Sequence, residues 1–218
     1  MNKKITIAID AMGGENSPDK ILKAVSLFNK KNNSKEDYVL HLFGDEKLIK
    51  AKLDDANISN NKIIVTHTES VISDEDTPLT AIKNSKNTSM WNCIQSQING
   101  NSDISLSAGN TGVLLVISRM ILKMMNKVNR PALAGLWPNQ KGMNVVLDLG
   151  ANIECSEDNL VDFAELGSAL YKSIFPEDKP IVSLLNIGSE EIKGTEVLKN
   201  AFKKLNSLSS ENNFKFNG

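Results

Sequence analysis

The sequence is poor in cysteine, in arginine and in aromatic residues. Of its 218 residues, two are cysteines and 5% are aromatic. The two cysteines, Cys93 and Cys155, cannot form a disulfide framework, and no CxxC spacing indicates a zinc site. Arg119 and Arg130 are the only arginines, so planar bidentate clamps on phosphate or carboxylate are scarce. An anionic ligand would therefore be held mainly by backbone N–H groups and lysines.

Several sequence signals of other protein classes are also missing. No apolar stretch reaches the roughly 18 residues of a membrane span, and the N-terminus lacks the pattern of a signal peptide. The 25 Lys and Arg residues nearly balance the 26 Asp and Glu residues, so a broad basic face for nucleic acid is not expected. Segment 188–195 fails the P-loop pattern because Lys193 precedes the second glycine. We expect an intracellular protein that binds no nucleic acid and hydrolyses no nucleotide.

Strand and helix signals alternate along the whole chain. The β-branched run Lys4–Asp10 predicts a buried strand, and Ser17-Pro18 predicts the start of the first helix. Segment 70–86 is polar, and its acidic run Asp74–Asp76 is interpreted as a solvated loop, with a lid as the alternative. Further strands are predicted over 38–43, 62–66, 103–107, 132–137, 143–149 and 180–185, and helices over 46–53, 90–98, 113–125, 159–175 and 195–205. This order predicts the α/β class, with a mostly parallel open sheet and helices on both faces.

The loop Ser107–Gly112 carries the sharpest local signal. It follows a predicted strand and opens a predicted helix, so free N–H groups and the positive end of the helix dipole would face a ligand there. Ser107, Asn110 and Thr111 add side-chain donors. Two interpretations remain open, because the same pattern is typical of an anion site and of a tight turn capped by Asn or Thr.

Two other strand ends share one form, an acid followed by glycine. Asp10–Gly14 and Asp148–Asn152 each predict either a ligand contact or a turn in which the Asp caps backbone N–H groups, and the turn is the commoner case. His67 also ends a predicted strand, whereas His41 lies inside one and is interpreted as structural. Lys193 is either a contact for an anion or a solvated lysine. The residues alone predict an α/β protein for an anionic ligand and no particular reaction.

Five loops in a fixed order resemble one protein family. They are Ile9–Gly14, Ser107–Gly112, Arg130–Ala134, Asp148–Asn152, and Leu184–Gly188 followed by Glu190, Glu191, Lys193 and Gly194. Together they resemble the phosphate acyltransferases of bacterial phospholipid synthesis, the acyl carrier protein:phosphate transacylases. The match runs from about Lys4 to the last residue. One departure is Glu15–Pro18, where the family usually has aspartate and then glycine-proline.

The resemblance implies a fold and an extent. It implies one α/β domain over residues 1–218, with a Rossmann-like, isocitrate-dehydrogenase-like arrangement of three layers. Family members are roughly half as long again, so the chain is expected to lack their C-terminal third. The segment 211–218 looks like the start of a strand and agrees with that expectation.

The resemblance also implies a reaction and partners. Inorganic phosphate would attack the thioester of a fatty acyl group on acyl carrier protein, giving acyl phosphate for phosphatidic acid synthesis. The expected protein is a cytoplasmic homodimer in peripheral contact with the membrane and with a membrane glycerol-3-phosphate acyltransferase. No cofactor or metal is predicted. The alternatives are a non-catalytic module that binds acyl carrier protein or phosphate, an acetyl-phosphate-type transacylase and an isocitrate-type dehydrogenase.

Site residues follow from the matched loops, except His67, which lies outside them and is added because it could assist departure of the thiol. The expected catalytic residues are Asn110, Arg130, Lys193 and His67. The expected substrate- and phosphate-binding residues are Asp10, Gly13, Gly14, Ser107, Gly109, Thr111, Gly112, Asp148, Asn152 and Asn186. Replacing Asn110 by Ala is expected to reduce turnover strongly and to leave folding intact.

Overall fold

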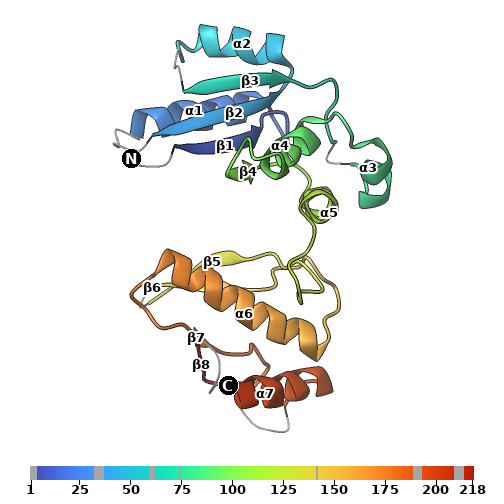
Figure 1. Ribbon diagram of the computed structural model, residues 1–218, viewed down its shortest axis with the longest axis vertical. Helices are drawn as coiled ribbons and strands as arrows, with labels where there is room; N and C mark the ends of the chain where they lie inside the picture. The colour runs from blue at the N-terminus through green and yellow to red at the C-terminus, as the bar shows by residue number, and fades with distance from the viewer. Residues whose placement is uncertain are drawn as a thin grey trace. The chain divides into compact units, whose positions relative to one another are not determined.

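A computed structural model describes residues 4–31, 37–58, 62–73, 75–140, 142–188, 193–208 and 214–218. The chain divides into two compact units, unit 1 (Met1–Lys123) and unit 2 (Met124–Gly218) (Figure 1). Each unit is described by itself. The single domain expected over residues 1–218 stays a prediction.

Unit 1 is built on a sheet of four parallel strands in the order β3-β2-β1-β4. The strands are β1 (Ile5–Asp10), β2 (Tyr38–Gly44), β3 (Ile63–His67) and β4 (Ile104–Leu106). The helices are α1 (Asp19–Lys31), α2 (Glu46–Asp55), α3 (Pro78–Asn84), α4 (Ser89–Ile98) and α5 (Thr111–Leu122). Because β1 and β4 are neighbours, the loops that follow them leave the same edge of the sheet.

Both faces of this sheet carry helices. Neighbouring residues of a strand point to opposite faces. Leu42 of β2 lies in one core cluster with Val25 of α1 and Ile49 of α2, whereas Phe43 packs with Cys93 of α4. The predicted fold class, a mostly parallel sheet with helices on both faces, is therefore confirmed (Figure 1).

The polar segment 70–86 contains the helix α3, which was not predicted from the sequence. Thr77 accepts a hydrogen bond from the backbone N–H of Thr80, whose hydroxyl accepts one from the N–H of Thr77. This is a capping box, and Pro78 occupies the first helical position, which suits its fixed φ. The capping signal outweighs the polar composition of the segment.

Unit 2 contains two short sheets and two long helices. The elements are β5 (Gly135–Asn139), β6 (Gly142–Val146), α6 (Glu157–Ile174), β7 (Ile181–Val182), α7 (Glu196–Leu208) and β8 (Lys215–Phe216). The predicted adjacent strands on either side of residue 140 pair antiparallel as β5 and β6, and β7 pairs parallel with β8. Ala164 of α6, Leu205 of α7 and Phe214 form the buried core.

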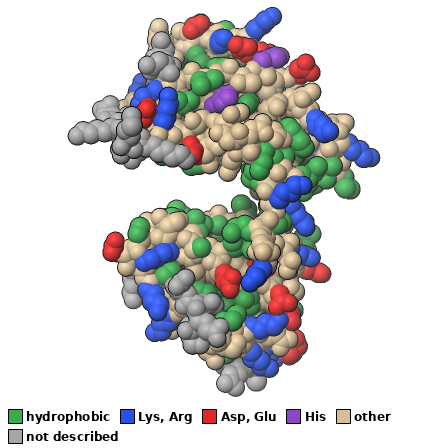
Figure 2. Space-filling view, viewed as in Figure 1, with side chains coloured by type: hydrophobic (Ala, Val, Ile, Leu, Met, Phe, Trp, Pro, Cys, Tyr) green, Lys and Arg blue, Asp and Glu red, His purple; other side chains and the backbone are tan. Residues whose placement is uncertain are grey.

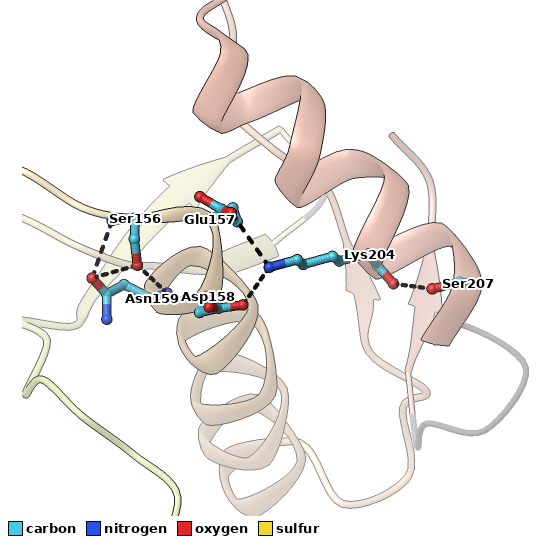
Figure 3. Close-up of polar contacts among 6 residues, drawn as sticks. All are labelled: Ser156, Glu157, Asp158, Asn159, Lys204 and Ser207. Atoms are coloured by element: carbon cyan, nitrogen blue, oxygen red, sulfur yellow. Dashed lines mark hydrogen bonds and ion pairs between the residues drawn. The ribbon is translucent and has the colours of Figure 1, made fainter.

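Polar contacts join the start of α6 to α7 (Figure 3). Ser156 caps α6 in a capping box with Asn159. The Lys204 Nζ of α7 lies 2.5 Å from an Asp158 carboxylate oxygen and 3.5 Å from a Glu157 one. Exposed ion pairs add little free energy, so this contact contributes little to the stability of unit 2. None of the helices in the described ranges is long and apolar enough to cross a membrane.

Candidate functional site

The loops after β1 and β4 meet at a buried carboxylate. Asp10, at the end of β1, is 1% exposed. One of its carboxylate oxygens accepts a 2.7 Å hydrogen bond from the Ser107 hydroxyl, and the other accepts a 3.3 Å bond from the Met12 N–H. The Ser107 oxygen in turn accepts a bond of 3.1 Å from the Gly109 N–H. A buried carboxylate needs such partners, so Asp10 and Ser107 tie the two loops together.

Two glycines let these loops approach closely. A Cβ atom on Gly13 would lie 2.4 Å from an Asp10 carboxylate oxygen. A Cβ atom on Gly14 would lie 2.2 Å from the Ala108 carbonyl oxygen, and Gly14 also has a φ of +81°. Both distances are far below van der Waals contact. Glycine is therefore required at both positions for the loops to touch.

The loop after β4 leads into the N-terminus of α5. Asn110 caps this helix: its amide oxygen accepts a 3.1 Å bond from the Val113 N–H, and its amide nitrogen donates a 3.0 Å bond to the Asp76 carbonyl. The first N–H groups of a helix have no partner inside the helix. Those of Thr111 and Gly112, both exposed residues, are therefore placed to meet a ligand or water. The capped turn and the anion site, set out as alternatives from the sequence, are compatible in this geometry.

Sequence reasoning missed a cation at this junction. The Lys20 Nζ lies 2.9 Å from the position that a Gly14 Cβ would take, beside the Ala108 carbonyl. Lys20 belongs to the first turn of α1 and is exposed. Its ammonium group is therefore placed to attract an anion beside Gly14. No local sequence signal distinguishes Lys20 from the other lysines of this helix.

His67 lies apart from this contact. It ends β3, and β2 separates β3 from β1 in the sheet. Its Nδ1 accepts a 3.3 Å bond from the Glu46 N–H at the start of α2. The His41 Nε2 lies 2.7 Å from the Thr66 hydroxyl, and in Figure 2 both histidine side chains lie at the surface of unit 1. The structure thus does not bring His67 to Asp10 and Ser107, and its catalytic role stays a prediction.

In unit 2, Asp148 organises the loop after β6. One carboxylate oxygen accepts bonds from the N–H groups of Leu133 at 2.8 Å and Ala151 at 3.1 Å. The other accepts bonds from the backbone and side-chain N–H groups of Asn152, at 2.8 and 2.9 Å. Burial alone would raise the pKa of Asp148, but these hydrogen bonds outweigh it and lower the pKa below its ordinary value.

Arg130 and Asn152 belong to the same loop system. The Arg130 guanidinium donates a 2.8 Å bond to the Glu154 carbonyl, and the Asn152 side chain donates one to the Pro131 carbonyl. Burial and the nearby Asp148 carboxylate raise the pKa of the Cys155 thiol, while Arg130 lowers it. Burial raises the pKa of Cys93 to about 12. Neither thiol is therefore set up as a nucleophile.

Asn186 and the segment at Lys193 form the third group of predicted residues. The Asn186 side chain donates a 3.4 Å bond to the Lys193 carbonyl and accepts one from the Ile187 N–H. A Cβ atom on Gly194, whose φ is +87°, would lie 2.8 Å from the Asn186 amide oxygen. The Lys193 side chain is exposed, and Glu190 and Glu191 lie outside the described residues.

The structure thus collects most predicted residues into three groups. The Asp10 group lies in unit 1, and the Asp148 and Asn186 groups lie in unit 2. Among the described residues, no group of three or more His, Cys, Asp and Glu side chains is arranged to hold a metal ion. The chemistry that these loops offer is the binding of an anion by backbone N–H groups and by lysine or arginine side chains.

Comparison with known proteins identifies the family. Residues 5–218 match the model of the family described as fatty acid synthesis protein. The chain belongs to this family. It is 50% identical over all 218 of its residues to the phosphate acyltransferase of Pelagibacter ubique, and covers 64% of that relative. It is 39% identical over 197 residues to the phosphate acyltransferase of Maricaulis maris, covering 90% of this chain and 56% of that one. The resemblance inferred from the five loops is confirmed.

Two solved structures share the fold of this chain. The chain superposes on the EutD phosphotransacetylase from Staphylococcus aureus with a TM-score of 0.67 at 16% identity. A phosphotransacetylase from Streptococcus pyogenes gives the same values, and in both cases the match covers 100% of this chain and 68% of the other. The likeness shows a shared α/β fold. The chain spans between 56 and 64% of the length of the two phosphate acyltransferases named above.

Proposed function

We propose that the protein transfers a fatty acyl group from acyl carrier protein to inorganic phosphate, giving acyl phosphate for phospholipid synthesis. The family match over residues 5–218 carries this proposal, with relatives that are named phosphate acyltransferase. The geometry of unit 1 supports it, because two strand-end loops and a helix N-terminus converge with a lysine where an anion would bind.

The reaction needs a positioned phosphate rather than an activated side chain. A phosphate oxygen attacks the thioester carbonyl carbon, and the carbonyl oxygen becomes an oxyanion. The tetrahedral intermediate collapses by breaking the carbon–sulfur bond, so the carrier leaves as a thiolate, which takes up a proton. A thiol with a pKa near 8.5 leaves with little acid assistance. The work of the protein is to bind the dianion, hold it against the carbonyl and stabilise the oxyanion.

We assign these tasks to the residues of the loops. The N–H groups of Thr111 and Gly112 and the Lys20 ammonium bind phosphate or the oxyanion, and Asp10 with Ser107 keeps their two loops in register. Asn110 positions the N-terminus of α5 through its two hydrogen bonds. Arg130 and Lys193 of unit 2 stay candidates for offsetting phosphate charge, and Asn152 and Asn186 for orienting the loops around them.

The partners in this proposal follow from the reaction. Acyl carrier protein delivers the thioester, and a membrane glycerol-3-phosphate acyltransferase consumes the acyl phosphate. A product with a fatty acyl chain favours release at a lipid surface, so we include peripheral contact with the membrane from the cytoplasm. A homodimer is part of the same proposal.

The test is phosphate-dependent release of free thiol from long-chain acyl–acyl carrier protein, measured with a thiol reagent. The assay uses this chain and, as a positive control, the phosphate acyltransferase of Pelagibacter ubique. The Lys20→Ala variant should lower kcat/KM for phosphate about tenfold, the effect of losing one charge-assisted contact. The matched control is Lys23→Ala, an exposed lysine of the same helix, which should leave the rate unchanged.

Two results would count against the proposal. If the folded chain binds acyl carrier protein or phosphate but releases no thiol while the positive control is active, the non-catalytic module becomes the better account of this chain. If K20A and K23A lower the rate equally, the lysine acts through general charge and our placement of phosphate at the α5 N-terminus is wrong.

A further inference from the structure

A buried methionine of α4 lies against the loop that follows β4. Met90 is 0% exposed and belongs to one core cluster with Ile94 of α4 and Val113 of α5. Its methyl carbon lies 3.0 Å from the position that a Cβ atom on Gly109 would take. The Met90 methyl group therefore fills the space that a side chain at position 109 would need, as the close packing of a protein core requires.

This contact, rather than backbone conformation, explains why residue 109 is a glycine. The φ of Gly109 lies outside the left-handed region, so its backbone is open to other residues. An alanine methyl group there would lie 3.0 Å from the Met90 methyl carbon and 3.3 Å from the Gly13 Cα. Both distances are shorter than the roughly 3.5–4.0 Å at which two carbon atoms attract best. Met90 is the nearest group that keeps a side chain out of this position.

Gly109 connects the core contact to the junction of the two loops. A Cβ atom on Gly13 would lie 3.0 Å from the Gly109 nitrogen, so the backbones of these glycines touch. The Gly109 N–H donates to the Ser107 hydroxyl, which in turn binds the Asp10 carboxylate. The next residue, Asn110, caps α5. A displacement of Gly109 therefore moves the loop junction and the N-terminus of α5 together.

We propose that Met90 is a positioning residue for phosphate and acts through Gly109. Met90 is fully buried, so it touches no substrate itself. Its methyl group fixes the place of Gly109 between the core and Gly13, and so fixes where the first N–H groups of α5 lie. Methionine suits this task because its unbranched side chain fills irregular gaps. The proposal rests on the proposed function, since phosphate is the nucleophile of that reaction.

The first test shortens Met90 without emptying the core. Met90→Leu nearly conserves volume but ends one atom earlier, so the contact with Gly109 is lost at little cost in stability. Inorganic phosphate is titrated into the chain by calorimetry. M90L should bind phosphate about tenfold more weakly, because small displacements of binding groups have large effects.

Ile94→Val is the matched control. Ile94 is 2% exposed in the same helix and core cluster, one turn beyond Met90, and is not among the nearest neighbours of Gly109. I94V should cost a similar amount of stability in urea unfolding, yet change phosphate affinity by less than about twofold. Equal changes of phosphate affinity in M90L and I94V would overturn the proposal, because Met90 would then act only through the stability of the core.

The second test exchanges the sizes of the two residues in contact. Gly109→Ala places a methyl group in the space of the Met90 methyl group and should weaken phosphate binding about tenfold. In the double variant of G109A with M90L, the alanine methyl group occupies the space that the shorter side chain leaves. Phosphate affinity should then return to within about threefold of the natural sequence, a strong departure from additivity. G109A with I94V gains no such space and should stay as weak as G109A.

Two further results of these experiments would also overturn the proposal. One is a double variant that recovers the free energy of unfolding but not phosphate affinity, since the contact would then stabilise the fold and position nothing. The other is a natural sequence that binds no phosphate, because there would then be no anion site for Met90 to position.

The thiol-release assay separates this inference from the proposed function. If thiol is released and M90L leaves the KM for phosphate unchanged, the positioning role fails and the transacylase stands. If no thiol is released but phosphate affinity follows the pattern expected for the single and double variants, Met90 positions an anion site and the proposed reaction fails.

Discussion

Units 1 and 2 each have an aspartate near a strand end, followed by glycine, and the two carboxylates have different partners. Asp10 is the last residue of β1, and Asp148 lies two residues after the end of β6. Asp10 is 1% exposed and joins its own loop to Ser107, which is 97 residues away in the sequence. Asp148 is only partly buried, and its carboxylate accepts hydrogen bonds from four N–H groups. Three of these belong to the next four residues of its own loop. One acid connects two loops of a sheet, whereas the other mainly folds a single loop.

The glycines of the two loops differ in the same way. Gly14 and Gly150 both have positive φ, +81° and +96°. A Cβ on Gly14 would collide with the Ala108 carbonyl of the neighbouring loop, whereas a Cβ on Gly150 would meet nothing within 4 Å. The first glycine is required by backbone conformation and by contact, and the second by backbone conformation alone. Similar sequence patterns therefore form a packed junction in unit 1 and an open turn in unit 2.

The largest predicted effect is a loss of stability that differs between substitutions of Gly14 and Gly150. Gly14→Ala should destabilise unit 1 by about 4 kcal/mol, because backbone strain adds to a clash that only a shift of the Ala108 loop relieves. Gly150→Ala should cost unit 2 about 1 kcal/mol, the strain of a positive φ alone. Urea unfolding followed by tryptophan fluorescence measures both.

The two tryptophans give each unit its own signal. Trp91 lies in α4 of unit 1 and Trp137 in β5 of unit 2, so W137F and W91F backgrounds report on one unit each. G14A should move the Trp91 transition more than the Trp137 transition, and G150A the reverse. Equal costs for the two substitutions would show that the contact between the β1 and β4 loops has no energetic weight.

Much of the fold is predictable from sequence because strand and helix signals are local. The β-branched run of β1 and the apolar run of α5 are each contained in one short segment, and both elements form close to where they are expected. The rule that parallel strands end at one edge also predicts that the loops of Asp10 and Ser107 lie near each other. The missed helix α3 was visible in its Thr77 and Pro78 cap, a local signal hidden by polar composition.

The rest of the site depends on long-range order that no local pattern contains. Strand order decides that Ser107 reaches Asp10 while His67, on the far side of β2, does not. The sequence gives no sign that Asp10 is buried and Asp148 partly exposed, because burial depends on which helices cover the sheet. Lys20 is ordinary in sequence, and its importance appears only when the Ala108 carbonyl and Gly14 are seen beside it.

The stability that Asp148 gives to unit 2 is expected to depend on pH. The pKa of Asp148 is lowered from its ordinary value of 3.8, so its hydrogen bonds stabilise the folded state fully above that pH. That stability is lost as the pH falls below 3.8 through the lower pKa of the folded state. Asp148→Asn should lower the free energy of unfolding of unit 2 at neutral pH by about 2 kcal/mol, reduced from the buried case by solvent screening.

The measurement is urea unfolding in the W91F background between neutral and acidic pH. The difference between D148N and the natural sequence should shrink as the pH falls below 3.8, since the Asp148 carboxyl group then becomes neutral, as the Asn amide is at every pH. A difference that stays constant through this range would show that the Asp148 charge contributes nothing. The Trp91 signal of unit 1, followed in the W137F background, is the control and should not respond to D148N.

The smallest predicted effect compares the helix caps of the two units. Asn110 caps α5 and also bonds the Asp76 carbonyl, so Asn110→Ala should cost unit 1 about 1 kcal/mol, and the expectation that it leaves folding intact is revised. Ser156→Ala removes the cap of α6 and should cost unit 2 a similar amount. Asn110→Asp keeps the capping oxygen and removes the amide donor. It should retain most of the stability but lose thiol release with N110A, because it adds a negative charge where we place phosphate. Full activity of N110D would limit Asn110 to the cap and remove its side chain from the phosphate site.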